Sequence, residues 1–124
     1  MSQTISNKRP EYDQLIQDIA NYVHSYRIQH DQSFDNAYWC LCDSIACALH
    51  GLQNVDCRKR LGAIVPESTC PNGARVLGTQ LMLDPAQAAY NNGLLIRWLD
   101  YNDYWGGEEW AHPSDNLGAI LAVA

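Results

Sequence analysis

The stretch SFDNAYWCLCDSIACALHG, residues 33–51, decides the fold of this 124-residue chain, because its apolar residues recur at helical spacing. Its apolar stripe consists of Phe34, Ala37, Tyr38, Leu41, Ile45 and Leu49. Positions 44–48 are rich in small residues, which favours close packing against another helix, and Gly51 is a typical helix stop. We therefore predict a helix over residues 33–51.

The same spacing predicts a helix before this stretch. Pro10 suits the first position of a helix, where its missing N–H has no partner to lose. Apolar residues then recur at Tyr12, Leu15, Ile16, Ile19, Val23 and Tyr26. We predict a helix over residues 10–26 that packs antiparallel to the helix over residues 33–51.

Helices are also predicted after the central stretch. A short one covers residues 55–61, and a longer one begins with Asp84 as N-cap and runs to Trp98, with Gly93 as a weak point. Residues 66–78 are rich in proline and glycine, so only 74–77 are expected to be extended. The fold class that we predict is all-α, a helical bundle with at least four helices and little sheet.

Composition excludes several classes of partner. The chain has 8 Lys and Arg against 14 Asp and Glu, a formal net charge of -6, which disfavours nucleic acid and anionic membrane surfaces. No apolar run is long enough for a bilayer span, and the N-terminus has no apolar signal core. We expect a cytoplasmic location, or the mitochondrial matrix if the source is eukaryotic.

Cysteine and histidine spacing does not predict a metal site. The five cysteines are odd in number, and Cys40, Cys42 and Cys47 lie on the predicted central helix, which disfavours disulfides and iron–sulfur ligation. The four histidines form no ligand motif such as HExxH. We expect free thiols, most of them buried in a helical core, and no metal.

The segment RWLDYNDYW, residues 97–105, and HPSDN, residues 112–116, hold the candidate site, and we expect no regular strand between them. Pro113 directs the chain out of helix after His112, and Ser114 or Asp115 can cap a last helix that carries Leu117, Ile120 and Leu121. A histidine at one helix start and carboxylates at another helix end can form an acid–base site. The alternative is that the acids only cap helices and His112 is an ordinary loop residue.

Several strings together carry a resemblance to a known family. They are RPEYD at 9–13, PNGARVLGTQ at 71–80, LDP at 83–85, RWLDYND at 97–103 and EEWAHPSDNLG at 108–118. With these strings the chain resembles, over nearly its whole length, the N-terminal portion of the MmgE/PrpD family in its 2-methylcitrate dehydratase branch. The resemblance implies a two-domain enzyme, helical plus an α/β lid, of which residues 1–124 would be an incomplete N-terminal part of the helical domain.

The resemblance also implies a reaction. Members of this branch are hydro-lyases that remove water from 2-methylcitrate to give 2-methyl-cis-aconitate in propionate catabolism, the methylcitrate cycle, without metal or cofactor. The implied partner is a small tricarboxylate, and a homodimer is one assembly open to the full-length enzyme. Two alternatives stay open, a cis-aconitate decarboxylase of the same family and a non-catalytic helical fragment.

Site residues follow from the family motif, which has an aspartate, a threonine four residues later and a histidine before proline. Asp100 and His112 match it, whereas Tyr104 stands in the threonine position, so we expect Asp100, His112 and Tyr104 to be catalytic. Expected substrate contacts are Arg97, Asn102, Asp103 and Ser114. A histidine can take or give a proton near neutrality.

Two observations lead us to expect that this chain alone is inactive. A tricarboxylate requires cationic groups, and Arg97 is the only one near the motif. The family's lysines and a further histidine would follow residue 124. The chain ends within an apolar run, residues 117–124, so we also expect the isolated chain to self-associate or to fray after Pro113.

Overall fold

The computed structural model describes residues 10–124, and the chain divides into two compact units, Met1–Asp31 and Gln32–Ala124, each described here by itself. The first unit contains helix α1 (Gln14–Ser25), whose described residues are all exposed. Its N-cap is Asp13, which accepts a hydrogen bond from the Ile16 N–H at 2.9 Å. The predicted start at Pro10 is therefore wrong, because Asp13 supplies the cap that Pro10 cannot. The antiparallel packing of this helix stays a prediction.

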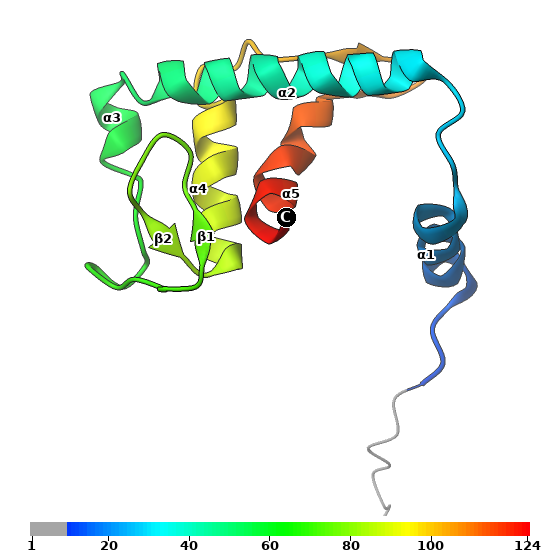
Figure 1. The fold of residues 1–124 in the computed structure, drawn as a ribbon, viewed down its shortest axis with the longest axis horizontal. Coiled ribbons are helices and arrows are strands. Elements are labelled where there is room, and N and C mark those ends of the chain that lie inside the picture. Colours follow the sequence, from blue (N-terminus) through cyan, green and yellow to red (C-terminus); the bar gives the residue numbers. More distant parts are fainter. Residues whose placement is uncertain (1–9) are drawn as a thin grey trace, which may run out of the picture. The chain divides into compact units, whose positions relative to one another are not determined.

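The second unit is mainly helical (Figure 1). Its helices are α2 (Asp31–Gly51), α3 (Val55–Arg58), α4 (Pro85–Arg97), the 3-10 helix η1 (Pro113–Asn116) and α5 (Leu117–Val123). Two antiparallel hairpins complete it, β1 (Ala74–Arg75) with β2 (Met82–Leu83) and β3 (Trp105–Gly106) with β4 (Trp110–Ala111). The prediction of a helical fold with little sheet is confirmed. Between residues 10 and 124, no helix is both long and apolar enough to cross a membrane.

The core forms where α4 and α5 pack side by side (Figure 1). Its buried apolar residues are Ala48, Cys57, Val76, Leu83, Ala88, Leu95, Ile96 and Ala122. Gly118 allows the close approach, since a Cβ there would lie 2.7 Å from the Ala89 carbonyl oxygen and 2.8 Å from the Gly93 nitrogen. An added Cβ at Gly93 itself would meet nothing within 4 Å, so it is Gly118 rather than Gly93 that the close approach requires.

The C-terminal half of α2 joins this core through its small residues, as the sequence predicts. Buried positions of α2 are Ser44, Cys47, Ala48 and Gly51, whereas Phe34, Tyr38 and Leu49 of the apolar stripe are exposed. A Cβ at Gly51 would lie 2.9 Å from the Leu95 carbonyl oxygen, so α2 reaches the backbone of α4 here. The expected N-cap Asp84 of α4 is confirmed, with the Ala86 N–H 3.1 Å from its carboxylate.

Two buried asparagines of α4 attach the irregular segment before it. Asn91 accepts from the Gly62 N–H at 2.8 Å and donates to the Gly62 carbonyl at 3.0 Å. Asn92 accepts from the Leu77 N–H at 2.9 Å, at the end of the segment 74–77 that the sequence predicts to be extended and of which only Ala74–Arg75 form a strand. These bonds satisfy buried polar groups and fix α4, whose far end carries the candidate site.

All five cysteines are free, and two of them, Cys47 and Cys57, are buried. Burial is the main cause that raises the pKa of both thiols above the ordinary range, so they remain neutral. The remaining three, Cys40, Cys42 and Cys70, are only partly buried, which corrects the expectation that most of the thiols lie in the core.

Candidate active site

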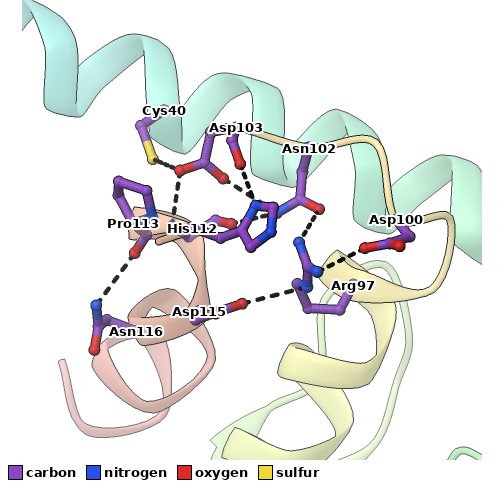
Figure 2. A network of polar contacts seen from close by, with 10 residues as sticks. Cys40, Arg97, Asp100, Asn102, Asp103, His112, Pro113, Asp115 and Asn116 are labelled. Carbon is purple, nitrogen blue, oxygen red and sulfur yellow. Dashed lines mark hydrogen bonds and ion pairs between the residues drawn. The ribbon is translucent and has the colours of Figure 1, made fainter. Parts of the chain in front are cut away.

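The candidate site is built on the loop that joins α4 to η1 and on the middle of α2 (Figure 2). Helix α4 gives way to this loop just before Asp100, whose φ of 53° lies in the left-handed region that aspartate tolerates better than most residues. After this turn, residues 101–103 run along α2, where Tyr101 contacts His50 and Asp103 contacts Cys40 (Figure 2). The expected position of Asp100 at a helix end is therefore what the structure shows.

Arg97 connects the two ends of this loop. Its Nη2 lies 2.6 Å from the Asp100 carboxylate, its Nη1 donates to the Asn102 side-chain oxygen at 2.7 Å, and its Nε lies 3.3 Å from the Asp115 carboxylate. All three guanidinium nitrogens thus have partners within the loop and η1 (Figure 2). Substrate contact by Arg97 stays a prediction, and it would compete with these interactions.

The Asp103 carboxylate collects donors from three elements. It accepts from the Ser114 backbone N–H at 3.0 Å, from the Asn102 amide at 3.1 Å and from the Cys40 thiol at 3.5 Å. Asn102 and Ser114 are buried and their side chains are hydrogen-bonded to each other. The N-terminus of η1 is capped by Asp103, eleven residues upstream. The last helix, α5, has Asn116 at its N-cap position, so the expectation that Ser114 or Asp115 caps that helix is wrong.

These contacts shift two pKa values in opposite directions. Burial alone would raise the pKa of Asp103, but hydrogen bonds from the Ser114 side chain and backbone, Cys40 and Asn102 lower it below the ordinary value. Burial and the negative charge of Asp103 raise the pKa of the Cys40 thiol. The pair is therefore an ionised acceptor and a neutral donor. Cys40 lies 63 residues from Asp103, and no sequence spacing could have indicated this partner.

His112 lies at the N-cap position of η1, as the sequence predicts, and is only partly buried. Its Nδ1 is 2.5 Å from the backbone carbonyl oxygen of Asp103. A carbonyl only accepts, so Nδ1 is the donor, and in the neutral ring Nε2 then holds the free electron pair. Edge-on aromatic rings of Tyr104 and Trp110 flank the imidazole, at centroid distances of 6.3 and 5.8 Å.

Residues between the two motif segments form a short hairpin, β3 paired with β4, so the expectation of no strand there is wrong. Residues 107–109 form the turn between the strands, and the Gly107 N–H donates to the Glu109 carbonyl at 3.1 Å. The hairpin places Tyr104 beside His112 with an exposed side chain. Among the described residues, no hydrogen bond joins Asp100 directly to His112; Asp100 is tied to Arg97 instead.

A hollow of about 470 Å³ lies over the same network. It is lined by Asn36, Trp39, Cys40, Asp43, Tyr101, Asn102 and Asp103. Two carboxylates and no cationic side chain line it, so its electrostatic field repels anions. Any tricarboxylate that approaches this face would need positive groups from elsewhere.

Fold and site together define a helical domain that presents a histidine at a helix start, tied to an aspartate-centred network. Residues 17–124 match the model of the MmgE/PrpD N-terminal domain, and the chain belongs to the MmgE/PrpD family.

Curated relatives are similar over the whole chain. The 2-methylcitrate dehydratase of Escherichia coli strain K12 is 54% identical over 124 residues, 100% of this chain and 26% of that protein. That of Cupriavidus necator is 53% identical over 98% of the chain and 25% of its own length. The mitochondrial 2-methylcitrate dehydratase of Yarrowia lipolytica is 48% identical over 95% and 23%. The chain thus spans about a quarter of these relatives.

Proposed function

We propose that this chain provides the N-terminal part of the helical domain of a 2-methylcitrate dehydratase, a hydro-lyase that acts on a small tricarboxylate. The observation that carries the proposal is the identity of 53–54% to enzymes of that name over essentially all of the chain. The geometry of His112, with one ring nitrogen bound to the backbone and the other available, supports a proton-transfer role.

In the proposed reaction, His112 Nε2 takes the proton from a carbon next to a carboxylate. The electrons of that C–H bond form the carbon–carbon double bond, and the hydroxyl on the neighbouring carbon leaves as water after it receives a proton. The hydroxyl of Tyr104 is our candidate for the proton donor, since its ring lies beside the imidazole. Asp100 would orient the substrate hydroxyl from the helix end.

Arg97, Asn102, Asp103 and Ser114 are proposed to shape this site. Direct substrate contact by them stays a prediction, and their internal pairing favours a supporting role: Asn102 and Ser114 are buried and bonded to each other. No cationic side chain lines the hollow that Asn102 and Asp103 help to form. We therefore propose that the clamp for the three carboxylates comes from another part of the enzyme, and that residues 1–124 alone have no dehydratase activity.

A chimaera tests this proposal. The 124 matched residues of the Escherichia coli relative are replaced by this chain, and formation of the product double bond from 2-methylcitrate is followed by ultraviolet absorbance and NMR. We expect turnover within about tenfold of the parent, and His112→Ala in the chimaera should lower kcat at least about a hundredfold, as loss of a general acid or base does. The isolated chain should show none.

His24→Ala is the matched control, because His24 is exposed on α1, and it should leave turnover unchanged. A folded chimaera without activity would favour a non-catalytic role for this chain. Release of carbon dioxide from cis-aconitate without dehydration of 2-methylcitrate would identify a decarboxylase. Full turnover in the folded His112→Ala chimaera would remove His112 from the mechanism.

A further inference from the structure

We infer that Asp103 is a positioning residue that selects the tautomer of His112: its carboxylate fixes the start of η1 while its own backbone carbonyl holds His112 Nδ1–H. This inference rests on the proposed function for its catalytic meaning, although the geometry stands without it. One residue thereby controls both the place of the imidazole and which of its nitrogens can accept a proton.

The carboxylate is fixed by donors that come from separate parts of the unit. Cys40 belongs to α2, Asn102 directly precedes Asp103 in the loop, and Ser114 is the second residue of η1, two residues after His112. Ser114 and Asn102 are buried, at 1% and 7% exposure, so water does not compete easily for these bonds. Asp103 therefore cannot rotate without losing partners on several elements.

The fixed carboxylate determines where the backbone carbonyl of Asp103 points. That carbonyl meets His112 Nδ1 at 2.5 Å, and Pro113 restricts the backbone directly after His112. With Nδ1 committed as donor, the neutral ring carries its proton on Nδ1 and its lone pair on Nε2. If Asp103 lost its anchors, the carbonyl would move, and the ring would be free to exchange tautomers or rotate.

The test reads the tautomer directly by NMR in the 124-residue chain labelled with nitrogen-15 in its histidine rings. Protonated and unprotonated ring nitrogens have well separated shifts, so a spectrum at about pH 9, where histidines with an ordinary pKa of about 6.5 are neutral, reports the tautomer. We expect the Nδ1–H form for His112. In Asp103→Asn, which keeps the backbone carbonyl, we expect a shift toward the mixture that the exposed His24 shows.

Asp115→Asn is the matched control. Like Asp103→Asn it removes one negative charge near the start of η1, but it leaves the hydrogen bonds of Asp103 in place. It should retain the Nδ1–H form. Cys40→Ser, which keeps a donor, should retain it too, whereas Cys40→Ala should weaken it. Far-UV circular dichroism of each variant verifies folding. If Asp103→Asn unfolds, the two Cys40 variants, Ser and Ala, test the same effect on the tautomer through a smaller change.

Two results would overturn the inference: an Nε2–H form in the wild-type chain, or an unchanged Nδ1–H form in folded Asp103→Asn and Cys40→Ala. Neither depends on turnover. Loss of the proposed function, seen as a fully active His112→Ala chimaera, would leave the tautomer result standing, so the two failures are distinguishable.

Discussion

At Asp103, one short side chain replaces the local cap that a helix start usually carries. Helix caps commonly come from the residue just before the helix, but His112 occupies that position in η1 and makes no side-chain cap bond. Capping from Asp103 leaves the imidazole available for other contacts. A residue with a chemical role can therefore stand at a helix start without an unsatisfied backbone N–H.

The lowered pKa of Asp103 predicts how stability depends on pH. A carboxyl group whose pKa is lower in the folded state than the ordinary value of about 3.9 stabilises the fold above that value. This contribution is lost as the pH falls through the folded pKa. In urea unfolding of the 124-residue chain, we expect Asp103→Asn to lower the midpoint clearly at pH 6. The difference should shrink steadily as the pH falls below about 4.

Asp56→Asn is the control for this series, because Asp56 makes only an exposed surface pair with Lys59. Its unfolding midpoint should stay near that of the wild type at every pH. An equal midpoint for Asp103→Asn and wild type at pH 6 would show that the Asp103 network does not contribute to stability.

Among the elements, α4 and α5 make the closest contact, and glycine decides it. We expect Gly118→Ala to destabilise the chain by about 1–3 kcal/mol, since the new methyl would meet the backbone of α4 and overpack the contact. Gly93→Ala is a matched control on the facing helix, because nothing lies within 4 Å of its added Cβ. It should be neutral, or stabilising by up to about 1 kcal/mol through helix propensity.

Thermal or urea unfolding of the two variants measures this difference. A Gly118→Ala chain as stable as wild type would contradict the close approach of the helices. Destabilisation by Gly93→Ala of similar size would show that the effect reflects glycine loss in general rather than contact at Gly118.

The secondary-structure elements were more predictable from the sequence than the contacts between them. Periodicity gave α2 and α4 because burial of one helical face leaves a local record in the chain, and Asp84 followed from cap chemistry. By contrast, the Cys40–Asp103 contact and the capping of Ser114 by Asp103 join residues far apart in sequence. Such contacts depend on how helices pack, which no local pattern specifies. The β3–β4 hairpin was missed because its strands are two residues each.

The candidate site was predicted in its residues but not in its connections. The sequence singled out His112, Asp100 and Arg97, and the structure places all three around one loop. It gave no reason to expect that Asp103 would hold the network together, because its partners lie on α2 and η1. The roles of these residues in catalysis stay predictions until the chimaera is assayed.

At the scale of the whole molecule, many large apolar side chains are exposed to solvent. On α1, Leu15 and Val23 are 69% and 70% exposed, and on α5, Val123 is 78% exposed. We expect the 124-residue chain to self-associate in sedimentation experiments as its concentration rises. Because the net charge of -6 opposes association, added salt should promote it by screening.

Leu15→Lys with Val23→Lys should reduce this association. Gln14→Lys with Asn21→Lys is the matched control, since it adds the same two charges to polar positions of α1 and should leave association largely unchanged. A chain that sediments as a monomer at every concentration and salt level would contradict the prediction. Equal effects of the two double variants would assign the association to charge alone.

The loop that carries the hairpin is closed at its base by Arg97 with Asp115 and by Asp103 with Ser114. The entropic cost of bringing the ends of a loop together grows only slowly with loop length. Each doubling of the length raises this free-energy cost by about 0.6 kcal/mol. Extra residues at the exposed tip, near Glu108, would therefore leave the base and His112 where they are. Evolution is free to lengthen or reshape this tip, and a laboratory insertion of a short peptide tag there should be tolerated for the same reason.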